Sequence, residues 1–307
     1  MQTSKSKKRF KLNKKQKDMI FYTVIIALPL LQFLIFYVGV NVNSVMLSFF
    51  SYDVNKGSYY WNNFKNFELF LFEFQSMSLF KAAFYNSIVA FVAGIIGKIL
   101  SLLFSFYIYK KFRGHKFFKV ILFMPSIISS IVMVTIFLQF VESGIPNIMS
   151  HVFDFEMLGF LANHKTTFGT IIFYNIWIGF GISILLYVGA MENINPSLIE
   201  AAKIDGANQF HEFFHVVMPM IWPTFVQLTV VSVAGIFINQ LNLFAFYGEH
   251  TQSRLYTFGY YLYRGVLKAS AADYPYLATV GIILTLISIP TVVIVRKLLL
   301  KYGPKVD

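Results

Sequence analysis

Six long apolar runs, separated by polar segments, dominate the chain. They lie at roughly 20–40, 84–108, 117–140, 168–190, 219–241 and 276–296. A helix of about 20 apolar residues spans a hydrocarbon layer about 30 Å thick, because each residue rises 1.5 Å. β-Strands would be shorter and separated by polar turns. The pattern therefore predicts an all-α integral membrane protein with six transmembrane helices.

The composition supports this interpretation. Of the 307 residues, 57% are apolar and only 13% are charged, whereas a soluble domain carries about a quarter charged residues. The sequence has no cysteine, which excludes disulfides, thiolate nucleophiles and Cys-based metal sites. The first run is too long for a cleaved signal peptide, and no A-x-A-like site follows it.

Basic residues collect on one side of the predicted spans. This side holds eighteen: Lys5, Lys7, Lys8, Arg9, Lys11, Lys14, Lys15, Lys17, Lys110, Lys111, Arg113, Lys116, Lys119, Lys203, Arg296, Lys297, Lys301 and Lys305. The opposite side holds seven, so both termini are expected in the cytoplasm. We interpret residues 1–18 as a basic segment that anchors on anionic lipid rather than nucleic acid. Residues 19–300 would form the transmembrane domain and 301–307 a cytoplasmic tail.

The loop between the fourth and fifth spans carries the most specific pattern. Asn195 can cap a short helix, and Pro196 suits its first turn, where a missing N–H has no intrahelical partner. Gly206 fits the left-handed position that ends a helix. A second short helix is expected before Pro219 opens the fifth span. Its apolar face beside the membrane would consist of Phe210, Phe213, Phe214 and Val217.

This loop resembles the EAA loop of type I ABC importer permeases almost position for position. The matching residues are Glu200-Ala201-Ala202, Asp205-Gly206-Ala207, Phe213 and Pro219. Further matches along the chain are Asn86-Ser87, Arg113-Gly114, Phe117-Phe118-Lys119, Pro125, Trp177 and residues 190–196. Over roughly 20–300 the chain is similar to the carbohydrate branch of that family, the maltose and glycerol-phosphate type. It lacks the glycine-rich tail of the second permease, so it resembles the first member of a heterodimeric pair.

The resemblance implies a transport subunit rather than an enzyme. Such a permease moves a sugar or oligosaccharide inward across the bacterial cell membrane with a second permease, a cytoplasmic ABC ATPase dimer and an extracellular substrate-binding protein. ATP and Mg would bind the ATPase, and this chain would hold no cofactor. Its Gly94-Ile95-Ile96-Gly97-Lys98 segment has the wrong spacing for a P-loop. A non-sugar solute such as a glycerol phosphoester remains the alternative substrate.

The resemblance also implies a coupling role for the loop. In the family, the glutamate of the EAA helix meets a basic group in a cleft of the ATPase, and we carry that role to Glu200. Ala201, Ala202 and Gly206 would permit close approach, and Asp205 completes the motif. The alternative interpretations are an ordinary connecting loop and, for Glu200, a solvated surface acid.

Polar and small residues in the spans predict a substrate pathway, because such groups usually face a cavity or another helix. In the fifth span they fall on one helical stripe: Ser232, Gly235, Asn239 and Asn242. In the fourth span Asn175 and Gly179 share a face with Ile182. The family places its sugar contacts on these two helices, at positions that include Asn175, Ser232 and Asn239. The alternative for each polar residue is an interhelical hydrogen bond.

Three positions depart from the family pattern. An isoleucine replaces a tyrosine at Ile182 and an asparagine at Ile236, and Gly235 replaces an aromatic residue. The pathway is therefore expected to be roomier or differently shaped. Lys98 is unexpected in a span, where a charge costs about 2.5–3.5 kcal/mol. It could extend toward the cytoplasmic surface or pair with an acid of a second permease.

Two external segments are rich in aromatic residues. The first would form an interfacial belt and contains Tyr52, Tyr59, Tyr60, Trp61, Phe64 and Phe67. The second, 249–276, would receive the binding protein or add to the belt. It contains Arg254, Tyr256, Phe258, Tyr260, Tyr261, Tyr263 and Arg264.

Two other functional classes fit the sequence less well. An ion-coupled secondary transporter usually carries acids within its spans, and the predicted spans contain essentially none. A membrane enzyme needs a catalytic cluster, yet the chain shows neither an HExxH nor a Ser-His-Asp pattern. His211 and His215 are spaced for one helix face, but no further ligands accompany them.

Overall fold

The computed structural model describes residues 13–304, and most of them are helical. The α-helices are α1 (Lys14–Gln32), α2 (Val40–Leu47), α3 (Lys65–Ser76), α4 (Ser78–Tyr109), α5 (His115–Ile127), α6 (Ser130–Gln139), α7 (Ile145–Phe153), α8 (Thr167–Glu192), α9 (Pro196–Ile204), α10 (Gln209–Glu212), α11 (Met218–Ala234), α12 (Leu243–Tyr247), α13 (Phe258–Lys268) and α14 (Tyr274–Tyr302). The π-helical turns are η1 (Phe33–Gly39), η2 (Phe140–Gly144) and η3 (Phe213–Val217), and η4 (Ser253–Leu255) is a 3-10 turn. The strands are β1 (Phe50–Asp53) and β2 (Ser58–Trp61).

Between residues 13 and 304, six helices are long and apolar enough to cross a membrane, which confirms the predicted number. They are Lys14–Leu47, Ser78–Tyr109, Ser130–Phe153, Thr167–Glu192, Gln209–Ala234 and Tyr274–Tyr302. The division into a basic segment, a membrane domain and a tail stays a prediction. Lys5, Lys7, Lys8, Arg9, Lys11 and Lys305 lie outside the described residues.

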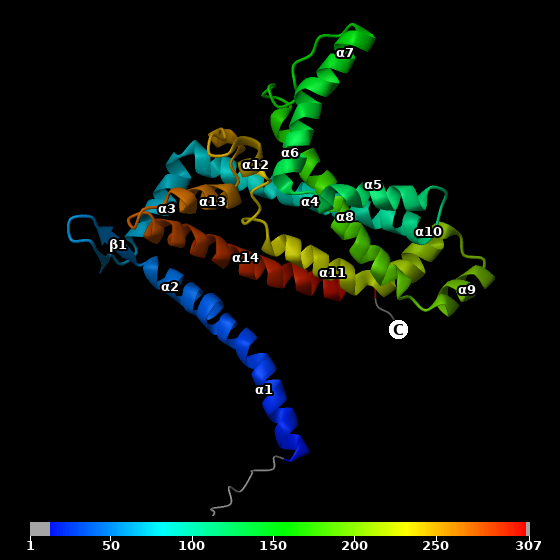
Figure 1. Ribbon diagram of the computed structural model, residues 1–307, viewed down its shortest axis with the longest axis horizontal. Coiled ribbons are helices and arrows are strands. Elements are labelled where there is room, and N and C mark those ends of the chain that lie inside the picture. The colour runs from blue at the N-terminus through cyan, green and yellow to red at the C-terminus, as the bar shows by residue number, and fades with distance from the viewer. Residues whose placement is uncertain (1–12, 305–307) are drawn as a thin grey trace, which may run out of the picture.

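The expected third span, 117–140, is not one helix. α5 ends at Ile127, and α6 begins at Ser130. Ile128 and Ser129 between them are extended, with ψ of 143° and 135°. Pro125, in the last turn of α5, lacks an N–H and weakens the helix just before this break. α5 and α6 therefore run in different directions (Figure 1), and the third long helix is Ser130–Phe153.

The expected fifth span, 219–241, is displaced toward the N-terminus. The helix already begins at Gln209, because the π-helical turn η3 joins α10 to α11 and carries the chain past Pro219 without a break. It ends at Ala234, and residues 235–242 are not helical. Two predictions were therefore wrong: the separate short helix before Pro219, and the continuous helical stripe from Ser232 to Asn242. The wider π-helical turn also changes which of the predicted apolar residues face the bundle. Phe213 and Val217 are buried, while Phe210 and Phe214 are exposed.

A small β-hairpin follows the first span and was not predicted. β1 and β2 pair antiparallel, with Tyr52 opposite Tyr59. Asp53 and Gly57 close the turn, and Gly57 has a positive φ of 64°. Of the residues predicted to form an aromatic belt, Tyr59, Tyr60, Trp61 and Phe64 are more than two-fifths exposed, which is consistent with that role.

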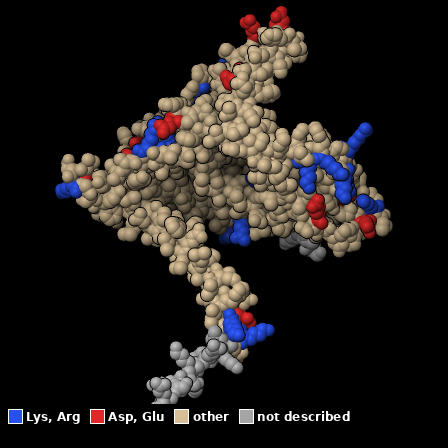
Figure 2. All heavy atoms as spheres, in the orientation of Figure 1, with Lys and Arg blue, Asp and Glu red and all other residues tan. Residues whose placement is uncertain are grey.

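The core of the bundle lies between α4, α8, α11, α13 and α14. α4 lies along α8, and α5 covers the other side of α8. The first membrane helix is different, because α1 buries none of its residues and projects away from the bundle (Figure 1). Figure 2 shows charged side chains in a few separate clusters, with uncharged atoms over most of the surface between them. This is the surface expected for a bundle that spans lipid.

The non-helical segment 235–242 is held in place by residues far away in the sequence. Thr257 Oγ1 donates a hydrogen bond to the Asn239 carbonyl at 2.8 Å. Gly259 lies directly beneath the segment, and a Cβ there would come within 2.2 Å of the Ile238 carbonyl oxygen. Irregular backbone at membrane depth is tolerated where protein satisfies its polar groups or where it lines a cavity. The packing around Gly259 therefore fixes the end of the fifth membrane helix.

Replacing Gly259 by alanine should force this segment to move. We expect Gly259→Ala to lower the free energy of unfolding by about 1–3 kcal/mol, because the added methyl group has no room. Gly281→Ala in α14 is the control, since a Cβ there meets nothing within 4 Å. Thermal unfolding of the detergent-purified chain measures the difference. Equal unfolding temperatures for the two variants would contradict this account of the packing.

Candidate coupling loop and transport cavity

The helix α9 has the local structure that its sequence predicts. Asn195 caps it, because its side chain accepts a hydrogen bond from the Ser197 N–H at 3.1 Å, and Pro196 occupies the first turn. Gly206 has a φ of 78° and follows the last turn. There the Ala207 N–H reaches back to the Ala202 carbonyl at 2.9 Å. The predicted caps at both ends are confirmed.

α9 is attached to the bundle on one side only. Ile199 is buried in a cluster with Met191, Phe213 and Val217. Glu200, Ala201, Asp205 and Gly206 are exposed, and Ala202 is half-buried. Ile204 is 86% exposed and Phe210 is 77% exposed. The loop therefore presents an acid and large apolar side chains together at its surface.

The loop continues directly into a membrane helix that reaches the centre of the bundle. Gln209–Ala234 is uninterrupted, and 26 residues at 1.5 Å each give about 39 Å. Asn208 begins this helix, since its side chain accepts a hydrogen bond from the His211 N–H at 2.8 Å. A stiff element therefore runs from the end of the loop to Ser232, near its other end.

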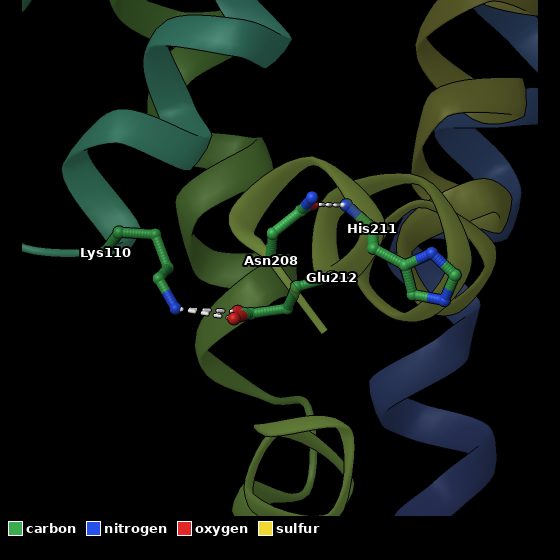
Figure 3. Close-up of polar contacts among 4 residues, drawn as sticks. All are labelled: Lys110, Asn208, His211 and Glu212. Atoms are coloured by element: carbon green, nitrogen blue, oxygen red, sulfur yellow. Dashed lines mark hydrogen bonds and ion pairs between the residues drawn. The ribbon is translucent and has the colours of Figure 1, made fainter. Parts of the chain in front are cut away.

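A buried ion pair fixes the start of this helix to α4 (Figure 3). Lys110 Nζ lies 2.8 Å and 2.7 Å from the two carboxylate oxygens of Glu212. The Glu212 side chain is 3% exposed and the Lys110 side chain 15% exposed. The Phe106 and Phe213 rings add a contact between the same two helices, with centroids 4.8 Å apart. The start of the fifth membrane helix is thus fixed to the end of the second.

Sequence reasoning missed this pair. Lys110 was counted only among the basic residues that set orientation. Glu212 stands within the run of Phe210, Phe213 and Val217, and an acid in an apolar helix face is a signal for a buried partner. Its neighbours His211 and His215 stack with ring centroids 4.0 Å apart. Across residues 13–304 no cluster of three or more His, Asp or Glu residues could hold a metal ion.

A cavity of about 530 Å³ lies between α4, α8 and the end of α11. All five residues proposed for the substrate pathway line it: Asn175, Gly179, Ser232, Gly235 and Asn239. Lys98 and Ile236 line it as well, whereas Ile182 is exposed and does not. The structure brings the proposed residues together although Gly235 and Asn239 lie beyond the helix.

The Asn175 side chain is occupied by hydrogen bonds within the protein. Its amide nitrogen donates to the Ile171 and Leu241 carbonyls at 2.8 Å and 3.0 Å. Its oxygen accepts from the Asn242 amide at 2.8 Å. Both donors are therefore used, one of them on the non-helical backbone after α11. In this structure Asn175 supports the cavity wall, which matches the alternative of an interhelical hydrogen bond.

Ser232 and Asn239 differ in what they offer to a solute. Ser232 Oγ donates to the Leu228 carbonyl at 3.2 Å, so its oxygen is left as an acceptor. Asn239 Oδ1 accepts from the Leu241 N–H at 2.8 Å, which leaves the exposed amide nitrogen as a donor. The non-helical segment therefore presents an N–H₂ group to the cavity.

Part of the external stretch 249–276, residues 255–260, belongs to the core. Tyr256, Phe258 and Tyr260 are buried, so they form neither a belt nor a docking surface. Asn86 holds the stretch by donating to the Arg254 and Tyr256 carbonyls at 2.8 Å and 2.9 Å. Charged groups remain at its surface, where the Lys268 ammonium hydrogen-bonds to the Glu249 carboxylate and lowers the pKa of that carboxyl.

A six-span bundle with an exposed helical loop and a cavity lined by a few polar groups is consistent with a membrane transport protein. Residues 90–303 match the family model described as binding-protein-dependent transport system inner membrane component. The chain belongs to this family, and the resemblance seen in its sequence is confirmed. Together with the six apolar helices, membership of this family indicates a multi-pass cell membrane protein.

Characterised relatives support this assignment. The chain is 29% identical over 164 residues to the sn-glycerol-3-phosphate transport system permease protein UgpA of Yersinia pestis, over 52% of this chain and 54% of that protein. It is 29% identical over 192 residues to the arabinooligosaccharides transport system permease protein AraP of Bacillus subtilis, over 61% and 60%. The match thus spans little more than half the length of these relatives.

A solved structure shares the fold. A chain of a bacterial ABC transporter involved in the import of the acidic polysaccharide alginate superimposes with a TM-score of 0.77. The match covers 94% of this chain and 97% of that one, at 20% sequence identity. The fold described above is therefore the fold of a permease chain.

The ion pair gives a test of how the loop is held. We expect Glu212→Gln to lower the free energy of unfolding by about 3 kcal/mol, because it leaves the Lys110 charge buried without a partner. The exchange Lys110→Glu with Glu212→Lys should recover part of this loss. Lys116→Met, an exposed lysine of α5, serves as the control. Thermal unfolding in detergent provides the measurement, and additive effects in the exchanged variant would contradict the pairing.

Proposed function

We propose that this chain is a permease subunit of a binding-protein-dependent ABC importer that moves a sugar or oligosaccharide inward. ATP hydrolysis would occur on a separate subunit. The observation that carries this proposal is the exposed, capped helix α9, which presents Glu200 and leads into a continuous helix that ends at the cavity. Family membership supports the same conclusion.

In this proposal the ATPase receives α9 in a cleft. Glu200 would pair with a basic group there, while Ile204 and Phe210 bury apolar surface against the ATPase. A charge-assisted hydrogen bond at such an interface is worth about 1.5–3 kcal/mol. Closing of the ATPase would push on α9, and the ion pair between Lys110 and Glu212 would carry the displacement into both α4 and α11.

The cavity is where the transported solute would pass. Its wall comes from three helices of this chain, and we propose that a second permease completes it. Both termini would lie in the cytoplasm, with the external surface around α13 receiving the binding protein. A complex with a substrate-loaded periplasmic protein is described for the alginate transporter, whose fold this chain shares.

The proposed class of solute is inferred from the names of the relatives. Their names include arabinooligosaccharides, polygalacturonan and rhamnogalacturonan, multiple sugars and sn-glycerol 3-phosphate. A carbohydrate is therefore our first proposal. A glycerol phosphoester is the second, and the relatives named for sn-glycerol 3-phosphate favour it.

Replacing Glu200 tests the coupling role. We expect Glu200→Lys to reduce ATP-dependent uptake by the assembled transporter about ten-fold or more, because the pair with the ATPase becomes a repulsion. The amount of chain in the membrane should not change, since Glu200 is exposed. Glu192→Lys, at the exposed end of α8, is the matched control.

Two results would contradict the proposal. Uptake at the wild-type rate by the Glu200→Lys transporter would exclude the coupling role. Uptake by this chain alone in liposomes, driven by an ion gradient without ATPase, would instead identify a secondary transporter.

A further inference from the structure

Lys98 is the one charged residue that lines the cavity within residues 13–304. It lies in α4, eleven residues before the end of that helix at Tyr109, or about 17 Å along the axis at 1.5 Å per residue. Its Nζ has no hydrogen bond or ion pair with any residue in that range. An ionisable group placed inside a membrane domain in this way needs a counter-charge.

The side of α4 on which Lys98 lies distinguishes between the explanations for a charge at this position. It shares the cavity lining with Gly94, Gly97 and Ser101. The exposed residues Ile96, Ile99 and Leu103 lie on the other side of the helix. A lysine that extends along lipid to reach the membrane surface belongs on that exposed side. Lys98 instead lies on the face of α4 that lines the cavity.

The nitrogen groups of the cavity lining suit a partner that accepts hydrogen bonds, while the oxygens of the lining residues Ser101, Ser183 and Ser232 can themselves accept. Lys98 offers three N–H donors and Asn239 offers two, none of which has a partner in residues 13–304. Both N–H donors of the Asn175 side chain already hydrogen-bond to backbone carbonyls. The donors of Ser101 and Ser232 go to the Gly97 and Leu228 carbonyls. No Asp or Glu is among the residues that line the cavity.

We propose that this cavity takes a solute that carries an anionic oxyacid group, a carboxylate or a phosphate. Lys98 supplies the counter-charge, and the Asn239 amide donates a second hydrogen bond. Neutral sugars offer hydroxyl groups that donate as well as accept, and they leave the lysine charge uncompensated. The inference rests on the proposed import function and narrows its substrate to acidic saccharides or sugar and glycerol phosphates.

The test uses the assembled transporter, with its second permease, ATPase and binding protein, in proteoliposomes. Lys98→Met removes the charge, and Lys98→Arg keeps it. Lys81→Met makes the same change at an exposed position of α4 outside the cavity lining. The probes are two matched pairs, trigalacturonate with its methyl ester and glycerol 3-phosphate with glycerol. The two pairs separate a carboxylate from a phosphate.

We expect ATP-dependent import of one anionic probe and little import of its neutral partner. Lys98→Met should slow this import about ten-fold or more, the effect of losing one charge-assisted contact. Lys98→Arg should retain most of it, and Lys81→Met should match the wild type. Binding of the probe to the binding protein should be the same in all cases, because only the permease is changed.

Several results would overturn the inference. One is ATP-dependent import of neutral probes alone, which would leave the proposed function standing. Another is import of the anionic probe at the wild-type rate by Lys98→Met. A third is an equal loss for both members of a pair together with poorer recovery of the second permease, which would show that Lys98 pairs with an acid of that subunit. Absence of ATP-dependent import of both anionic probes would overturn this inference, whereas the proposed function would fall only if neutral saccharides such as arabinooligosaccharides were not imported either.

Discussion

The transport account depends on one mechanical connection. The buried ion pair between Lys110 and Glu212 ties the start of the helix Gln209–Ala234, which follows the loop that carries Glu200, to the end of α4. The uninterrupted helix Gln209–Ala234 runs from this loop to the cavity. Because α4 and α11 both line that cavity, a displacement of the loop reaches two of its three walls. A flexible connection would lose such a displacement in local bending.

The cavity itself depends on an interrupted helix. α11 ends at Ala234, and the chain then runs as irregular backbone along the cavity. Asn175, Thr257 and Gly259 hold that backbone. This arrangement places the exposed Asn239 side chain in the cavity wall. Lys98 adds the only charge among the described lining residues, so the chemistry of the cavity is set by a few groups from distant parts of the sequence.

The sequence predicted what is local. Long apolar runs were sufficient for six membrane helices, and Asn195, Pro196 and Gly206 were sufficient for both ends of α9, because caps depend on neighbouring residues. The break after Ile127 follows Pro125, which sequence analysis had used only as a family match. The end of α11 could not be predicted in the same way, because it depends on close contacts with distant residues such as Gly259. The ion pair likewise joins residues about a hundred positions apart.

The most direct test of the central claim measures whether nucleotide on the ATPase reaches the cavity through the loop. The chain has no cysteine, so Ser232→Cys places a single thiol in the cavity wall. Its labelling rate can be measured in the assembled transporter with and without a non-hydrolysable ATP analogue. The account predicts that nucleotide changes this rate when Glu200 is present and has no effect in a Glu200→Lys background. The same nucleotide response in both backgrounds, or none in either, would contradict it.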